Sequence, residues 1–148
     1  MKKFFKLLGL STVLFLTACA KTEMTSSQQD AQAKEFNIPK KGLSGLYIYR
    51  DSIFGSALKK NLYIDDQFIG ESAPKVFFYK QVKAGNHKIS TESEFSNNDL
   101  NIKTDSGKNY FIRQYIKLGV FVGGANLEHV SEEKGKAAVK ELKMAVTH

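Results

Sequence analysis

The segment Asn61-Leu62-Tyr63-Ile64-Asp65-Asp66-Gln67-Phe68-Ile69-Gly70 has the pattern of a β-hairpin. Leu62 and Ile64 alternate with their neighbours, as expected of a strand that has one buried face. Asp65-Asp66 suits a tight turn, because aspartate side chains hydrogen-bond to nearby backbone groups and tolerate left-handed conformations. The segment therefore predicts two paired strands, with Leu62 and Ile64 facing the core.

Further short β-rich segments lie on both sides of this hairpin, separated by Gly, Asn, Asp or Pro. Besides the hairpin, the predicted strands cover residues 45–50, 75–82, 87–93, 100–103, 109–117 and 120–122. Many short strands with turn residues between them are typical of an antiparallel sandwich or barrel. We therefore expect a mainly β fold, an antiparallel β-sandwich or barrel-like domain. A single domain over residues 36–148 is long enough for one core.

The end of the chain has helical spacing instead. Ser131 is a suitable N-cap, and Glu132-Glu133 places two acids in the first turn. The apolar residues that recur at helical spacing are Ala138, Leu142 and Ala145. This pattern predicts one C-terminal amphipathic helix over about residues 131–146. We expect its apolar stripe to pack on the sheet, and contact with a membrane or a partner is the alternative.

A candidate binding surface follows from the alternation of side chains along Gly45–Arg50. Tyr47 and Tyr49 share one face of the strand and Ile48 takes the other. If Ile48 faces the core, the tyrosines lie outside, where Tyr and Arg suit contact with carbohydrate or protein. The residues of this candidate surface are Tyr47, Tyr49, Arg50, Arg113 and Tyr115. The interpretation we favour is that both sheet faces are covered, because the consecutive aromatics Phe77–Tyr79 must also point to both faces.

The start of the chain has the pattern of a bacterial export signal. Lys2, Lys3 and Lys6 precede a run of about ten mostly apolar residues. That run is too short to span a bilayer, which takes about 20 residues. It ends in Leu16-Thr17-Ala18-Cys19, which resembles the lipobox of bacterial lipoproteins. The lipobox residues are Leu16, Thr17, Ala18 and Cys19. The resemblance implies a signal peptide over residues 1–18 and a lipid on Cys19.

Residues 19–35 are polar and rich in Ser, Thr, Gln and Ala, which predicts a lipidated, flexible tether. As a coil of about 15 residues it would reach about 20 Å, and the alternative is a short helix near Gln28–Lys34. Ala20 follows Cys19 where lipoproteins retained in the inner membrane carry aspartate. By that resemblance we expect a lipid anchor in the outer membrane, facing the periplasm of the cell envelope.

Charge and cysteine content bound the function further. The formal net charge is +7, and loss of the three signal-peptide lysines leaves +4. This mild excess favours anionic lipids or cell-wall polymers and does not indicate nucleic acid, for which a basic stripe on a known module is expected. Cys19 is the only cysteine, so the mature domain has no internal disulfide and no thiol nucleophile.

Several stretches together resemble a known family. They are GLYIYRD (45–51), SIFGSA (52–57), LYIDDQFIGES (62–72), VKAGNHKIS (82–90), SGKNYFIRQ (106–114) and SEEKGKAAVKELK (131–143). The chain resembles domain of unknown function 2846, small bacterial lipoproteins with an uncharacterised β domain, over nearly all of the mature sequence. Its middle portion is also similar to PEGA-like β modules. Neither resemblance implies a reaction, a cofactor or catalytic residues.

The sequence offers little that would support catalysis or metal binding. His87, His129 and His148 are far apart, and no HExxH or CxxC occurs. Glu128-His129 lies near Ser131, but no G-x-S-x-G elbow is present. We therefore predict no enzyme activity, no metal and no cofactor.

The function we expect is a non-enzymatic interaction module, anchored to the membrane, that binds an envelope protein or a cell-wall polymer. A lipoprotein that binds a small ligand or glycan through exposed aromatics is the alternative. A hydrolase with dispersed catalytic residues is the weaker alternative.

Overall fold

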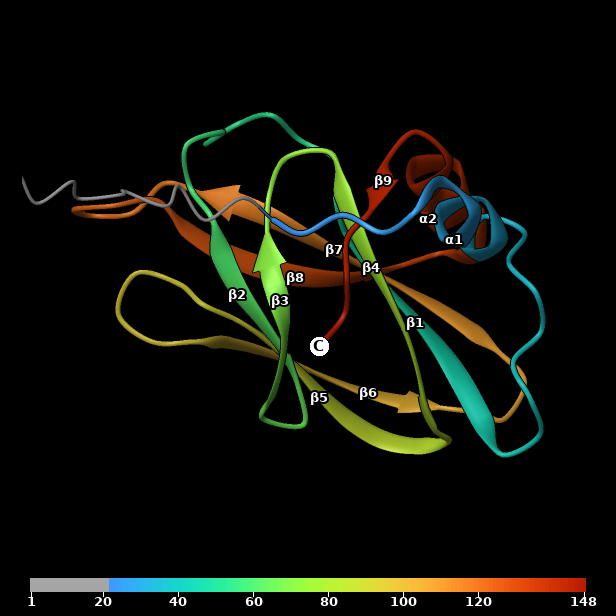
Figure 1. The fold of residues 1–148 in the computed structure, drawn as a ribbon. Coiled ribbons are helices and arrows are strands. Elements are labelled where there is room, and N and C mark those ends of the chain that lie inside the picture. Colours follow the sequence, from blue (N-terminus) through green and yellow to red (C-terminus); the bar gives the residue numbers. More distant parts are fainter. Residues whose placement is uncertain (1–21) are drawn as a thin grey trace, which may run out of the picture.

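The computed structural model describes residues 22–148, so the predicted signal peptide, the predicted lipobox and Cys19 lie outside the described residues. The domain is a two-layer β-sandwich with helices packed on one side (Figure 1). The strands are β1 (Leu43–Arg50), β2 (Lys60–Ile64), β3 (Gln67–Ser72), β4 (Val76–Lys83), β5 (Gly85–Thr91), β6 (Asn98–Thr104), β7 (Asn109–Lys117), β8 (Gly124–Val130) and β9 (Lys143–Met144). The helices are α1 (Ser27–Ala33) and α2 (Glu132–Lys140).

The four-stranded sheet, in the order β3-β2-β5-β6, is antiparallel throughout. Its β2–β3 hairpin confirms the prediction from Asn61–Gly70. Asp65 and Asp66 have φ values of 51° and 65°, as the two central residues of a type I′ turn require. Leu62 and Ile64 are buried, as predicted.

The five-stranded sheet, in the order β8-β7-β1-β4-β9, is mixed rather than fully antiparallel. The central strand β1 pairs antiparallel with β4 but parallel with β7, and β9 pairs parallel with β4. A parallel pair needs a long connection, and all four strands of the other sheet lie in the chain between β1 and β7. The predicted sandwich is confirmed, with these two parallel pairings as the difference.

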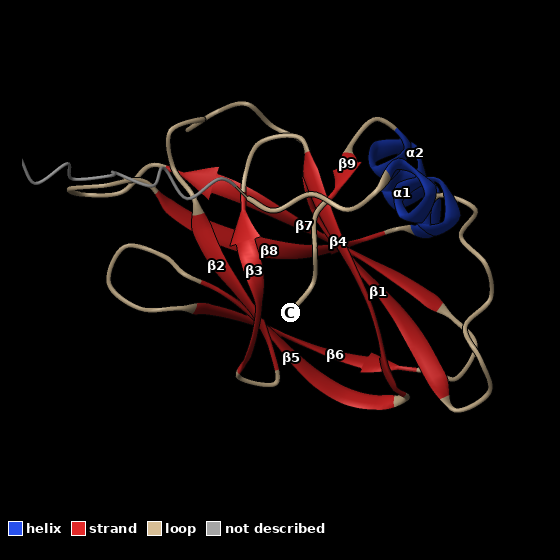
Figure 2. Cartoon of the chain, viewed as in Figure 1, coloured by secondary structure: helices blue, strands red, loops and turns tan. Residues whose placement is uncertain are grey.

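Side chains of β1 and β4 divide between two cores. Leu46, Ile48 and Phe78 point into the space between the sheets. Tyr47, Tyr49 and Phe77 point to the opposite face, where Val139 of α2 and Ala33 of α1 cover them. Figure 2 shows both helices on this face of the five-stranded sheet. The interpretation that both faces are covered is therefore correct.

The stretch before the sandwich departs from the predicted flexible tether. Residues 22–35 pack on the domain, and α1 begins with a capping box between Ser26 and Gln29. Met24 forms a β-bridge with Ala145, and the Asp30 carboxylate accepts a hydrogen bond of 2.7 Å from the Met144 backbone N–H. The segment is ordered because the end of the chain supplies backbone partners, which its own composition does not reveal.

The C-terminal helix is shorter than predicted. Ser131 caps α2 as expected, but the helix ends at Lys140 rather than near residue 146. The chain then extends, and β9 pairs with the start of β4. Leu142 and Ala145 are still buried in this segment, Leu142 in the core under the helices and Ala145 in the core between the two sheets. Among residues 22–148, no helix is long and apolar enough to span a membrane.

The last sheet strand was also misplaced. The predicted strand at Val120–Val122 is an exposed loop, and β8 lies instead at Gly124–Val130. Segment 124–130 contains polar residues that alternate with buried ones. By composition alone, the more apolar triplet Val120–Val122 was the better candidate for a strand. In the structure it pairs with no strand.

Candidate functional site

The predicted aromatic binding surface does not form. Tyr47 and Tyr49 are buried under the helices, each 1% exposed. Tyr47 donates a hydrogen bond from its hydroxyl to the Ala33 carbonyl oxygen at 2.8 Å, and its ring stacks on Phe111 with centroids 4.9 Å apart. Burial raises the pKa of Tyr49 to about 12. These tyrosines build the second core, so they offer no surface to a glycan.

Arg50 is also interior, and its role is structural. Its guanidinium donates hydrogen bonds to the backbone carbonyl oxygens of Leu58 at 2.6 Å, Gly55 at 2.8 Å and Phe54 at 3.2 Å. All three carbonyls belong to the loop between β1 and β2. Arg50 therefore fixes this loop onto the end of the sandwich, since the planar guanidinium presents several donors in a rigid arrangement.

Arg113 and Tyr115, the other two residues of the predicted surface, are half-buried on β7. Arg113 pairs with Asp51 at 2.8 Å and with Glu128 at 3.1 Å, and its guanidinium lies 5.9 Å from the Tyr115 ring centroid. This cluster ties the β1–β2 loop to β7 and β8.

The residues considered for hydrolysis, Glu128, His129 and Ser131, have different interaction partners. Glu128 pairs with Arg113, and the His129 ring lies against Tyr110 with centroids 5.8 Å apart. The Ser131 hydroxyl accepts a hydrogen bond from the Lys134 backbone N–H as the cap of α2. They form no nucleophile–base pair. Within residues 22–148 no group of three or more His, Cys, Asp or Glu side chains could hold a metal ion.

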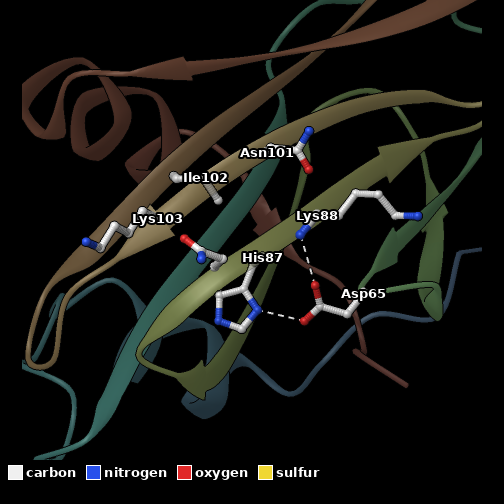
Figure 3. Close-up of a pocket in the computed structure, with 7 residues that line it drawn as sticks. Asp65, His87, Lys88, Asn101, Ile102 and Lys103 are labelled. Atoms are coloured by element: carbon white, nitrogen blue, oxygen red, sulfur yellow. Dashed lines mark hydrogen bonds and ion pairs between the residues drawn. The ribbon is translucent and has the colours of Figure 1, made fainter.

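A hollow of about 580 Å³, lined by residues of β5 and β6, lies beside the hairpin turn (Figure 3). His87 Nδ1 lies 2.6 Å from an Asp65 carboxylate oxygen, and Nε2 lies 2.7 Å from the Lys83 carbonyl oxygen. The second Asp65 oxygen accepts a hydrogen bond from the Lys88 backbone N–H at 2.9 Å. Both ring nitrogens are therefore engaged, so His87 is a structural brace for the turn and has no nitrogen available as a general base.

The most distinctive exposed feature is a group of apolar side chains on three loops at one end of the sandwich. The loops are β1–β2, β5–β6 and β7–β8. We call this group the apolar loop end, and its residues are Ile53, Phe54, Phe95, Leu118, Val120, Phe121 and Val122. Exposed apolar side chains gathered at one end of a soluble domain are typical of interaction sites.

The apolar loop end is held in place from below. The Glu94 carboxylate accepts hydrogen bonds from the backbone N–H groups of Val120 at 2.7 Å, Val122 at 3.1 Å and Phe121 between them. These hydrogen bonds, that from Phe121 above all, keep the pKa of Glu94 below its usual range. Phe95, next to Glu94, meets Phe121 edge to face with ring centroids 6.3 Å apart.

Sequence reasoning missed this site because an apolar triplet suggested a strand. Its flanking glycines were the available signal. A Cβ on Gly119 would lie 1.6 Å from the Val122 carbonyl oxygen, and one on Gly123 would lie 2.2 Å from Leu58 Cδ1. The lack of space for a Cβ at both glycines shows that residues 119–123 form a compact loop instead of a strand.

Comparison with known proteins places the chain in a family. Residues 40–125 match the family described as "Protein of unknown function (DUF2846)", and the chain belongs to this family. The matched range holds β1 to β7 and ends at the start of β8, so it includes the apolar loop end and stops short of α2.

A protein of Haemophilus influenzae (strain ATCC 51907 / DSM 11121 / KW20 / Rd) is 70% identical over 139 residues, which cover 94% of this chain and 83% of that protein. Its description is "Uncharacterized protein". No solved structure matched the chain.

Proposed function

We propose that this protein is a lipid-anchored lipoprotein of the cell envelope, most simply of the outer membrane facing the periplasm, with a non-enzymatic interaction domain. The observation that carries the proposal is the sequence Leu16-Thr17-Ala18-Cys19 directly after an apolar run. The diacylglyceryl group on Cys19 supplies the membrane attachment, because several acyl chains together anchor stably where one does not.

The described domain supports an interaction role rather than a reaction. Its polar clusters are used internally: Arg50 holds a loop, Arg113 joins strands and His87 braces a turn. What it offers outward is the apolar loop end. The partners we propose are the membrane, through Cys19, and an envelope protein or cell-wall polymer. The glycan-binding alternative is disfavoured, because Tyr47 and Tyr49, which it requires on the surface, are buried in the second core.

Replacement of Cys19 tests the anchor. Cys19→Ala should abolish incorporation of labelled fatty acid and cleavage before residue 19, because no thiol remains for the lipid. Labelled fatty acid on the wild-type chain is the positive reference, and Ser11→Ala, in the apolar run, is the matched control. Wild-type processing and membrane retention of the Cys19→Ala chain would overturn the proposal.

The interaction role has its own test. Crosslinking of intact cells followed by capture of the wild-type protein should recover one reproducible envelope component. Cys19→Ala, no longer concentrated at the membrane, should recover less of it. If no component recurs across growth conditions, the proposed role is wrong even where the lipid anchor is present.

A further inference from the structure

The apolar loop end carries side chains that no other part of the described chain covers. Phe121 is 82% exposed, Leu118 85% and Phe95 75%. They come from two different loops, so folding has gathered them from separate places in the sequence. An apolar group of this size is costly in water unless something covers it.

The loop is built to hold these side chains outward. Glu94 binds three successive backbone N–H groups of residues 120–122, which fixes the backbone of the tip. Its base is packed as well, since Ala125 donates a backbone hydrogen bond to Ser93 Oγ at 3.2 Å and Asn98 donates from its amide to the Ala125 carbonyl oxygen at 2.6 Å. The tip is therefore preformed for its partner and would not need to be ordered on binding.

The described chain begins at this same end of the sandwich. Thr22 donates a hydrogen bond from its hydroxyl to the Glu71 carbonyl oxygen at 3.2 Å, near the end of β3. The Glu71 carboxylate pairs with Lys59 at 3.7 Å, and Lys59 closes the β1–β2 loop. Figure 1 shows the blue start of the described chain passing the end of β3, on the side from which the β7–β8 loop projects.

The reach of the remaining chain is short. Cys19 is three residues from Thr22, a span of at most about 10 Å when fully extended. A lipid on Cys19 would thus hold this end of the domain at the bilayer surface. The opposite end, with the β6–β7 turn, would point away from it.

From this geometry we infer that the apolar loop end is a membrane-contacting face that inserts its apolar tips into the bilayer carrying the lipid anchor. The inference rests on the proposed lipidation of Cys19 and specifies the lipid surface as the partner of this face. Phe121, Val120 and Leu118 enter the region between headgroups and acyl chains. Lys117, exposed at the base of the loop, reaches the anionic headgroups while its stem lies along apolar surface.

The test compares two equally exposed positions at opposite ends of the domain. Phe121 is 82% exposed and Ile38 is 83% exposed, and Ile38 lies beside Gly107 in the β6–β7 turn. The full-length chain is expressed with its signal, purified in detergent and reconstituted into vesicles of phosphatidylethanolamine and phosphatidylglycerol. The anchor consumes the thiol of Cys19, the only cysteine, so Phe121→Cys or Ile38→Cys provides one free thiol for an environment-sensitive fluorophore.

We expect the fluorophore at position 121 to shift its emission to shorter wavelength and to be quenched by nitroxide-bearing lipids. The fluorophore at position 38 should emit as it does in water and resist quenching. Leu118→Cys repeats the measurement at a second site of the apolar loop end, in case substitution at position 121 disturbs the loop.

Three results would overturn the inference. The first is no quenching at positions 121 and 118, and the second is equal quenching at positions 121 and 38. The third is an emission shift at position 121 without nitroxide quenching, which would mean that a second copy or another protein covers this face. Mass spectrometry of the same samples separates this failure from failure of the anchor. Acyl chains on Cys19 with an unquenched position 121 leave the lipoprotein proposal standing. A Cys19 without acyl chains overturns both.

Discussion

His87 has an acceptor at each ring nitrogen, an arrangement that suits its protonated form. Only the imidazolium carries a hydrogen on both nitrogens, and here one faces Asp65 and the other the Lys83 carbonyl. Burial lowers the pKa of His87, but the hydrogen bonds to Asp65 and Lys83 outweigh it, and the pKa lies above its usual value of 6.5.

Folding stability should therefore depend on the protonation of His87. Because its pKa is raised in the folded state, the stabilisation is fully present below 6.5 and is lost as the pH rises through the folded-state value. We expect the free energy of unfolding in urea to fall as the pH is raised above 6.5 and through the folded-state pKa of His87. His87→Gln should flatten this decline, and so should Asp65→Asn, which removes the charged partner. An unchanged slope in both variants would contradict the assignment.

At the scale of elements, α2 lies unusually close to the sheet because of one residue. Gly135 is buried in the middle of the helix, and a Cβ at this position would lie 2.2 Å from Phe111 Cβ. Glycine costs a helix about 1 kcal/mol relative to alanine. The close packing of Gly135 and Val139 of α2 against Phe111 of β7 is what offsets that cost.

Gly135→Ala should accordingly destabilise the protein, although it improves helix propensity. The added methyl group meets Phe111 next to its backbone, where relief requires α2 to move, and overpacking of this kind costs about 1–3 kcal/mol. Urea denaturation measures the change. Lys134→Ala, one residue away on the exposed side of α2, should stay within about 0.5 kcal/mol of wild type. A Gly135→Ala protein as stable as wild type would show that α2 packs less closely.

At the scale of the whole molecule, the two ends of the described chain are joined. Thr25 donates a backbone hydrogen bond to the Met144 carbonyl oxygen at 3.0 Å, and Val146 donates one to the Glu23 carbonyl oxygen at 2.8 Å. Residues 22–35 are thereby part of the domain instead of a spacer.

This joining predicts slow hydrogen exchange at both ends. The backbone amides of Thr25 and Val146 should exchange far more slowly than in the urea-unfolded chain, because each is hydrogen-bonded across the junction. Mass spectrometry of peptides from residues 22–35 and 141–148 would measure it. Exchange at the unfolded rate in both peptides would restore the flexible tether that the composition suggests.

Much of the fold follows from local sequence pattern. The β2–β3 hairpin, most strands and the Ser131 cap could be predicted, because turn residues, alternation of side chains and capping act over a few neighbouring positions. The predicted lipobox is likewise a local pattern, and the Cys19→Ala labelling experiment tests whether Cys19 carries a lipid. The candidate site was less predictable. Tyr47 and Arg50 have the chemistry of a binding surface, and nothing in their immediate neighbours indicates that both are buried.

The sequence by itself determined a mainly β fold with a capped helix near the C-terminus and predicted a lipobox at residues 16–19, since each depends on short-range spacing. Only the tertiary structure decided which faces are covered, where α2 stops and that residues 22–35 join the domain. The tertiary structure also brings Phe95 and Phe121 together at one end of the sandwich. The β1–β2 loop, whose last residue Lys59 pairs with Glu71, lies at the same end. These features depend on partners far away in the chain, such as β4 for β9 and Glu94 for the β7–β8 loop, and their geometry exists only once both sheets have formed.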